Sequence, residues 1–457
     1  MQERVQISDE QINRELLSGV LHTPLWFWGL VLLLGAVAGV GVIAAGFLVY
    51  FGVGVLGLNR PVFWGFLITN FVFWVGISHA GVMISAILRL TQAEWRRPVT
   101  RAAEVLTIFA LSTAALFPLI HTGRPWRALY WVFPYDFSRG IWPNVRSPLI
   151  WDPSAIFTYL TGTILFVFIA LVPDLGMVRD RTTGWRHKLY SVLSLGWEGN
   201  PRQWRLQAVA GILLSALILP VFVSVHSIVS WDFGMAVAVE TWHATVFAPY
   251  FVIGAVHSGV SAVVTMMALL LWIFKLKNYI RPDHFDALGR LLVVVATAWL
   301  YFYVLDFFFG MYALEPQEIA NRTLIMFQWP MSFMFVLFAL ASYFIPIPLW
   351  LSRKNRRNIT LMFWSSILVN IGMWMERFQI IVPGLMRKEP FTFTWGGYAP
   401  TVVELAMVTG SFALVGLGLL IFSKFFPLIP AWEQKEGQLL QDEVQVGRAK
   451  VPGLVHE

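Results

Sequence analysis

The sequence predicts an all-α polytopic membrane protein with ten transmembrane helices. Of its 457 residues, 57% are hydrophobic and only 13% are charged, whereas soluble domains carry about 25% charged residues. Ten apolar runs are each long enough to cross a bilayer as a helix. Because the hydrocarbon offers no water to backbone groups, each run must satisfy its own hydrogen bonds by forming a helix. The predicted spans are residues 25–51, 62–88, 105–121, 149–172, 207–230, 246–274, 288–310, 324–345, 359–382 and 401–426.

The distribution of Lys and Arg predicts the orientation of these spans. The side that holds both termini carries 24 of the 33 Lys and Arg residues, and the opposite side carries nine. Such an excess of cations marks the cytoplasmic side of a membrane protein. The first 22 residues are polar and lack the pattern of a cleavable signal. We therefore expect a multi-pass protein with both termini in the cytoplasm.

An internal repeat predicts how the helices are grouped. The second span carries FWVGISHAGV and the sixth carries FVIGAVHSGV, 178 residues later. Four helices separate the copies, so both point the same way. We therefore expect two parallel four-helix bundles, formed by spans 2–5 and 6–9, with spans 1 and 10 peripheral. The corresponding division is 1–24 (cytoplasmic segment), 25–61 (first span and outer loop), 62–239 (first bundle, with the candidate site), 240–382 (second bundle), 383–426 (outer loop and last span) and 427–457 (cytoplasmic tail).

The composition also limits the chemistry that this chain can perform alone. It has no cysteine, which excludes disulfides, thiolate nucleophiles and an iron–sulfur cluster held by its own thiolates. His243 and His257 are 14 residues apart, the spacing of two haem ligands on one helix, but the second span has only His79 to match them. We therefore expect no haem, no iron–sulfur cluster and no metal site in this chain. The net charge of +7 reflects topology, and nothing suggests nucleic-acid binding.

Two ionisable residues at outer helix ends are the first functional candidates, because ionisable groups inside a membrane are costly. His121 ends the third predicted span and Asp152 begins the fourth. A neutral His can accept one proton of a membrane-soluble quinol, and a nearby carboxylate can orient that His or accept the second proton. The structural alternative is that both residues cap their helices, Asp152 beside Pro153. The two roles are compatible.

Four further residues extend this polar cluster. His226 and Asp232 lie at the next outer end, where they belong to the same pocket or are simply a helix-end His and a loop Asp. His79 and His257 fall near the middle of the membrane. They form either a buried hydrogen-bonded pair that locks the bundles together or part of a proton relay.

Three acidic residues, Asp306, Glu376 and Glu404, also fall near outer helix ends and are candidates for a proton path. The structural alternatives are a local ion pair of Glu376 with Arg377 and a solvated position for Glu404.

The loop between the third and fourth spans is rich in arginine and aromatic residues. Arg124 and Trp151 are further candidates for the pocket. The rest of the loop predicts a docking surface for a partner, with the residues Trp126, Arg127, Trp131 and Arg139.

Five motifs together resemble the NrfD/polysulfide-reductase family of membrane subunits, and within it the quinol-oxidising subunits of alternative complex III. They are FPLIHTGRPW (117–126), PNVRSPLIWDP (143–153), LSLGWEGNPRQW (193–204), ETWHATVFAPYFV (240–252) and NIGMWMERF (370–378). The resemblance covers essentially the whole chain. It implies ten helices in two bundles in a bacterial cytoplasmic (inner) membrane, with menaquinol oxidised near the outer face.

The resemblance also implies site residues and partners. His121 and Asp152 fall where the family places its quinol-contacting His and Asp, and Asp232 matches a further acidic position. Electrons are expected to leave through an outer-side iron–sulfur subunit and then pentahaem and monohaem cytochrome c subunits, beside a homologous membrane subunit, ActF. The second half has Gln328-Trp329-Pro330 where the first has Trp151-Asp152-Pro153, so we expect one quinol site, in the first bundle.

Three other functions compete with quinol oxidation. An NrfD-like anchor of another molybdopterin/iron–sulfur oxidoreductase would share the family features. A pure membrane anchor would use the acids and histidines only structurally. A transporter would also contain repeats and mid-membrane histidines, but its repeats are commonly inverted, whereas these copies are parallel.

Overall fold

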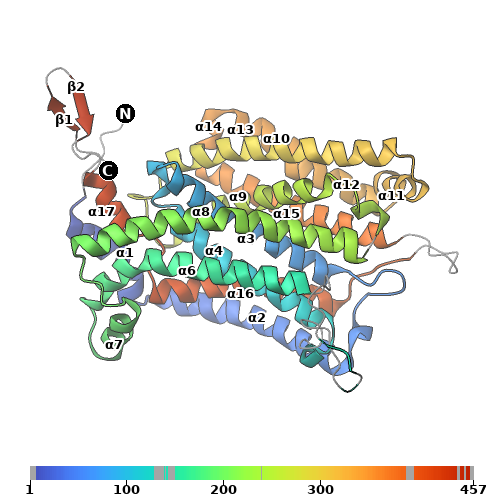
Figure 1. Ribbon diagram of the computed structural model, residues 1–457, viewed down its shortest axis with the longest axis horizontal. Helices are drawn as coiled ribbons and strands as arrows, with labels where there is room; N and C mark the ends of the chain where they lie inside the picture. Colours follow the sequence, from blue (N-terminus) through green and yellow to red (C-terminus); the bar gives the residue numbers. More distant parts are fainter. Residues whose placement is uncertain are drawn as a thin grey trace.

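The computed structural model confirms a helical membrane protein, and the residues that it describes contain ten helices long and apolar enough to span a bilayer (Figure 1). It describes residues 7–127, 138, 140–142, 150–237, 239–386, 396–439, 443–446 and 449–452. The spanning helices are α2 (Leu25–Phe51), α3 (Phe66–Leu90), α4 (Thr100–His121), α6 (Trp151–Arg179), α8 (Pro201–Trp231), α9 (Phe247–Ile273), α10 (Pro282–Tyr312), α12 with α13 (Met331–Ala339 and Pro346–Leu351), α15 (Ile359–Leu385) and α16 (Val402–Phe425). Short π or 3-10 segments are η1 (Val53–Val55), η2 (Glu94–Arg96), η3 (Pro125–Arg127), η6 (Asp232–Val237), η7 (Glu240–Trp242) and η8 (Leu340–Phe344).

Helix α3 is largely buried and packs against α4, α8 and α9. Helices α3 and α9 approach closely because glycines lie at their crossing: a Cβ on Gly259 would collide with the Ala80 side chain, and one on Gly76 would lie 3.3 Å from Ser258 Oγ. Small residues permit such close backbone contact in membranes, where packing rather than water exclusion holds helices together.

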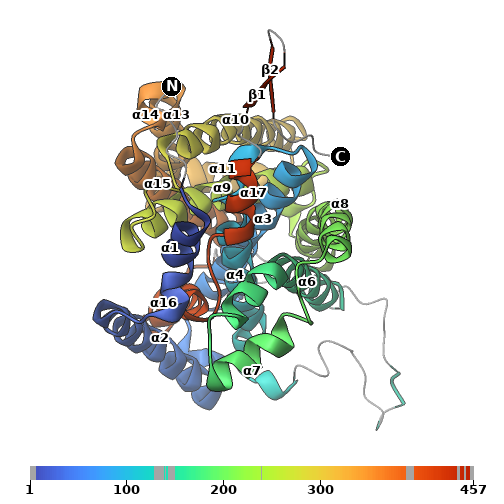
Figure 2. The same ribbon diagram turned by 90° about the vertical axis from the view of Figure 1, so that its left-hand side faces the viewer.

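Helices α2 and α16 pack against each other at the edge of the molecule, as Figure 2 shows. Their backbones touch at Gly41 and Gly410, where an added Cβ would lie 2.9 Å and 2.7 Å from the opposing Cα. Most of α2 is exposed and apolar, as expected for a lipid-facing helix.

The predicted span 324–345 is wrong at its start. Residues up to Phe327 form a separate helix, α11 (Pro316–Phe327), and α12 begins only at Met331. Helix α11 ends with its cap residue Gln328, whose backbone is extended, and Trp329 and Pro330 follow. Trp329 directly precedes a proline and is therefore disfavoured in helical conformation, so the helix is interrupted here. Further along, Pro346 removes a backbone donor, and the helix passes through the π segment η8 before α13.

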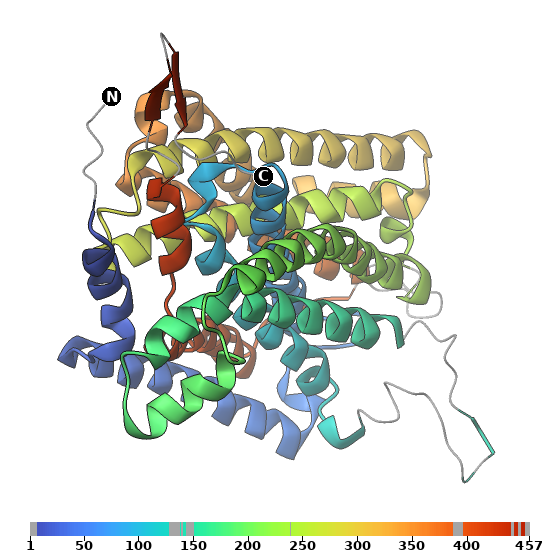
Figure 3. The ribbon, with the colours of Figure 1, turned by 60° about the vertical axis from the view of Figure 1, so that its left-hand side comes forward.

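The face that holds both termini carries elements that the hydrophobic pattern could not reveal. Figures 1 and 3 show helices at the end of the molecule where both termini lie. They are α1 (Asp9–Leu21), α7 (Gly184–Leu193), α14 (Arg353–Arg356) and α17 (Ala431–Leu439), followed by the antiparallel hairpin of β1 (Glu443–Val446) and β2 (Ala449–Pro452).

A buried ionic cluster fixes α17 beneath the first half of the protein. Asp174 of α6 pairs with Arg101 of α4 and accepts hydrogen bonds from the backbone N–H of Ala431 (3.1 Å), at the start of α17. Glu433 of α17 is buried between Arg96 (2.6 Å) and Arg89 (3.2 Å). Burial opposes ionisation of Glu433, but the neighbouring guanidinium groups outweigh it and hold the pKa of this carboxyl below its ordinary value.

Candidate functional site

A pair of carboxyl groups forms the outer end of the first candidate site. Asp152 lies in the first turn of α6, and Asp232 directly follows the last residue of α8. Their side chains are hydrogen-bonded to each other. An ionised carboxylate has no donor, so this bond requires a proton on one of the two groups. The pair therefore holds one exchangeable proton. One buried oxygen of each carboxyl has no hydrogen-bond partner in the described part of the chain.

His121, the last residue of α4, is the third member of this outer end. Its Nδ1 is buried and has no hydrogen-bond partner among the described residues, and no hydrogen bond links it to Asp152. Helix capping does not account for either residue. The cap of α4 is Thr122, whose hydroxyl donates to the Leu119 carbonyl, and α6 has no side-chain cap bond. Asp152 instead faces Asp232.

Two other pocket candidates flank this end. Arg124 is exposed just after α4, and Trp151 is half-buried as the first residue of α6. Of the predicted docking surface, Trp126 is exposed. Trp131 and Arg139, the side chain of Arg127 and most of the motif at 143–153 lie outside the described residues.

His226 lies deeper than its predicted position at the outer end. It precedes Asp232 by six residues on α8, about 9 Å along the helix axis. Its ring lies 4.5 Å from that of His79 and is stacked 5.0 Å from that of Phe251. Neither ring nitrogen of His226, nor Nε2 of His79, has a partner within the described chain. The structure therefore groups His226 with the mid-membrane His79.

The hydrogen-bonded pair of His79 and His257 that the sequence left open is not formed. His79 Nδ1 faces the Val75 carbonyl of its own helix. His257 Nε2 lies 3.0 Å from the Ser342 carbonyl, and its ring is stacked on Trp299 at 5.8 Å. Trp299 Nε1 in turn lies 3.4 Å from Glu376 Oε1. His257 therefore contacts residues of the second half of the chain, and Trp299 lies between it and Glu376.

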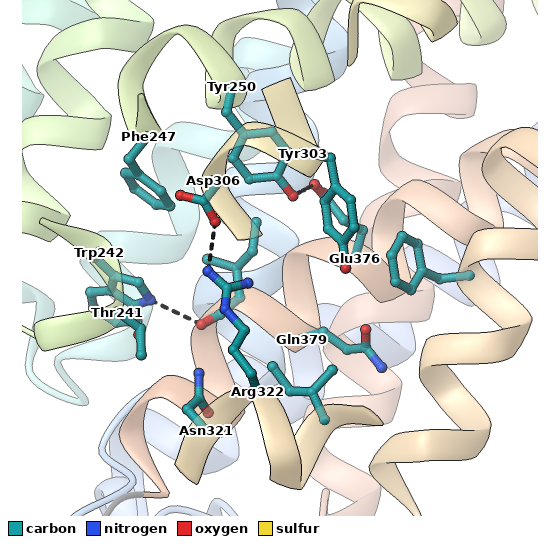
Figure 4. A pocket seen from close by; sticks show the side chains of 13 residues that line it. Thr241, Trp242, Phe247, Tyr250, Tyr303, Asp306, Asn321, Arg322, Glu376 and Gln379 are labelled. Atoms are coloured by element: carbon teal, nitrogen blue, oxygen red, sulfur yellow. Dashed lines mark hydrogen bonds and ion pairs between the residues drawn. The ribbon is translucent and has the colours of Figure 1, made fainter. Parts of the chain in front are cut away.

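A small polar cavity of about 40 Å³ lies among residues of the second half of the chain (Figure 4). Asp306 of α10 and Arg322 of α11 point toward each other and form an ion pair of 2.7 Å. Arg322 also bonds Glu318, at 2.8 Å. On the far wall, Glu376 of α15 accepts a hydrogen bond from the Tyr250 hydroxyl. Asp306 and Glu376, predicted separately, therefore line one cavity.

The unpaired atoms of this cavity are mostly acceptors. One oxygen each of Asp306, Asn321, Glu376 and Thr241 is buried without a hydrogen-bond partner in the part of the chain that the structure describes. Several buried acceptors around one polar cavity suit water molecules or the transfer of protons between them. Glu376 also forms the predicted local ion pair with Arg377, at 3.4 Å.

Glu404 has a structural role. Its carboxylate accepts hydrogen bonds from the backbone N–H of Thr401 (3.0 Å) and Gly57 (2.8 Å) and from the Tyr398 hydroxyl (2.7 Å). With Thr401 it forms a capping box at the start of α16. These bonds account for a carboxylate at this position without a proton path.

Sequence reasoning missed four residues of these sites: Arg322, Tyr250, Tyr303 and Tyr159. Arg322 carried a signal, because it is the one cation of its outer loop. Tyr250 lies within the motif at 240–252, whereas Tyr303 and Tyr159 carried no signal, since aromatic residues occur throughout the chain. Tyr159 of α6 lies 5.0 Å from His79, ring to ring, and its hydroxyl donates to the Ser78 carbonyl (2.9 Å). Among the described residues, no group of three or more His, Asp or Glu side chains could hold a metal ion.

Comparison with known proteins places the chain in a family. The model of the family described as "Polysulphide reductase, NrfD" matches residues 54–389. A putative membrane subunit of a dimethyl sulfoxide reductase from Halobacterium salinarum is 24% identical over 81% of this chain and 85% of its own. An Hdr-like menaquinol oxidoreductase integral membrane subunit of Archaeoglobus fulgidus is 22% identical over 88% of this chain and 94% of its own. With ten spanning helices and a family match over most of its length, this multi-pass membrane protein belongs to the NrfD polysulphide reductase family.

Proposed function

We propose that the chain is ActC, the quinol-oxidising membrane protein of an alternative complex III. The observation that carries the proposal is the pair of Asp152 and Asp232, with His121 at the end of the neighbouring helix α4 and buried polar atoms that face no partner among the described residues. Unpaired polar groups at membrane depth are costly, and a bound hydroquinone would satisfy them through its two hydroxyls.

The proposed reaction uses these groups as proton acceptors. A menaquinol enters from the bilayer, and its two O–H bonds break as two electrons leave to an outer-side iron–sulfur partner. His121 takes one proton at a free ring nitrogen. The carboxyl pair takes the other, because it holds one proton and therefore has room for a second. Both protons then pass to the outer side, and the quinone is the product.

The comparisons and the resemblance supply the proposed substrate and partners. The Archaeoglobus relative is named as a subunit of a menaquinol oxidoreductase, and this name supports menaquinol as the substrate here. The resemblance to alternative complex III supports an outer iron–sulfur subunit, pentahaem and monohaem cytochrome c subunits, and ActF as partners. A second candidate, the anchor of a molybdopterin/iron–sulfur oxidoreductase, is favoured by the name of the Halobacterium relative, a membrane subunit of a dimethyl sulfoxide reductase.

The proposal is tested by quinol-dependent reduction of haem in the purified complex. We expect His121→Ala to lower the rate about 10²-fold or more, because general-base catalysis contributes at least that much. Subunit stoichiometry would show that the variant complex assembles. His187→Ala, at an exposed histidine of the cytoplasmic helix α7, is the matched control and should leave the rate unchanged. A complex that does not reduce its haem with quinol, or an active His121→Ala variant, would contradict the proposal.

The proposal also includes proton translocation beyond this release. It would use the second half, where His257, Trp299, Glu376, Tyr250 and Asp306 follow one another toward the outer side.

In complexes reconstituted into liposomes, His257→Gln is expected to lower the number of protons moved per electron while quinol oxidation continues. Glutamine can keep the hydrogen bond to Ser342 but cannot titrate. An unchanged ratio at normal turnover would exclude His257 from a proton path.

A further inference from the structure

Helix α7 lies at the rim of the cytoplasmic face. It connects the inner ends of α6 and α8, and Figure 2 shows it at the outside of the helix assembly, near α2 and α6. Two contacts fix it to the body of the protein: the Tyr190 hydroxyl donates to the Phe425 carbonyl (2.9 Å), and Arg186 donates to the Val20 carbonyl (2.7 Å). The helix is therefore held at the level where α6 and α8 leave the membrane.

The opposite face of α7 is apolar and uncovered. Trp185, Val192 and Leu195 are 66%, 73% and 65% exposed, and Lys188 is exposed between them. Their spacing of three and seven residues from Trp185 places Lys188 and Val192 on the same side of α7 as Trp185, and Leu195 follows just past the end of the helix. No described part of the chain covers this stripe.

Unpaired cations lie on α7 and at the start of α8. The segment 180–206 contains five Lys and Arg against two acids. Lys188, Arg202 and Arg205 are exposed and have neither an ion pair nor a hydrogen bond to any described side chain or backbone group. Arg202 and Arg205 lie in the first turns of α8, directly before the exposed Leu206, where the lipid-facing surface of that helix begins.

We propose that α7 and the start of α8 form an interfacial site for anionic phospholipids of the cytoplasmic leaflet. Trp185, Val192 and Leu195 enter the boundary between headgroups and acyl chains, and Lys188, Arg202 and Arg205 bind the lipid phosphates. A helix with one apolar, tryptophan-containing face and flanking cations is typical of such binding. Anionic lipid is the complementary partner, because a cytoplasmic leaflet attracts clustered Lys and Arg beside a transmembrane helix. Helix α7 lies at the rim of the cytoplasmic face, at the level where α6 and α8 leave the membrane. The cytoplasmic leaflet is therefore beside it.

The test uses the full-length protein in nanodiscs that contain phosphatidylcholine with or without phosphatidylglycerol. Native mass spectrometry would count the phosphatidylglycerol molecules that stay bound, and a photoactivatable phosphatidylglycerol would mark the peptide it touches. We expect the wild type to retain this lipid selectively and to be labelled in the peptide that contains Trp185. In Lys188→Glu/Arg202→Glu, retention and labelling should fall several-fold, and Trp185→Ser should lower labelling of this peptide.

Lys354→Glu is the matched control, because Lys354 is an exposed cation on the same face, on α14, outside the stripe. It should keep the retention and labelling of the wild type. Equal melting temperatures in phosphatidylcholine alone would show that all variants fold. If the double variant retains and contacts as much phosphatidylglycerol as the control, the inference is overturned, whatever the outcome of the quinol assay. The same holds if the lipid labels other cytoplasmic segments but not α7.

Discussion

Replacing Asp152 by asparagine is expected to slow quinol-dependent haem reduction by about 10²–10⁴-fold while the complex still assembles. The amide group of asparagine can donate a hydrogen bond to Asp232, so the contact between α6 and α8 survives. The amide cannot take up a proton at working pH, so the pair loses its capacity to accept the second proton of the quinol. The rate would be measured in the purified complex, with subunit stoichiometry as the check on assembly.

Two further variants give this prediction its controls. Asp283→Asn changes an exposed carboxylate in the first turn of α10 and should leave the rate unchanged. Asp232→Asn should slow the reaction as well, and the double variant should be little slower than the worse single one, because residues that act as a unit are not additive. If Asp152→Asn assembles and turns over normally, the carboxyl pair is structural and the pure-anchor interpretation gains support.

The sequence predicted the spanning helices well because the bilayer leaves little choice. An apolar run of about 20 residues must be a helix there, so all ten spans were found, and the one failure fell at Gln328 before Trp329-Pro330. Helices α7 and α17 were missed because their short polar segments carry no comparable signal. Their positions depend on tertiary contacts such as Tyr190 to Phe425 and Asp174 to Ala431.

The candidate site was only partly predictable, for a related reason. His121, Asp152 and Asp232 were chosen because an ionisable group at membrane depth stands out in the sequence. The contact of His226 with His79 was not foreseen, because it joins residues 147 positions apart on different helices. Depth along a helix can be counted from its ends, but the direction in which each side chain faces depends on packing. For this reason the sequence also could not distinguish the cap formed by Glu404 from the cavity-lining Glu376.

The largest expected effect on stability comes from the buried ion pair of Arg101 and Asp174. In Arg101→Leu, Asp174 would stay fully buried with its charge uncompensated, which costs about 3–5 kcal/mol. The carboxylate also holds the start of α17, so we expect α17 to detach before the bundle unfolds. Thermal unfolding would show a lowered melting temperature, and limited proteolysis would show faster cleavage after residue 427.

Arg353→Leu, at an exposed arginine on the same face, should change neither measurement. The double variant Arg101→Leu/Asp174→Leu separates the charge from the packing. It removes both buried charges and should recover part of the lost stability, since an apolar pair in place of a buried ion pair is often neutral or stabilising. If the double variant is as unstable as Arg101→Leu alone, the loss comes from packing of the arginine side chain rather than from an unpaired carboxylate. In that case α17 is held mainly by Glu433 and its arginine neighbours.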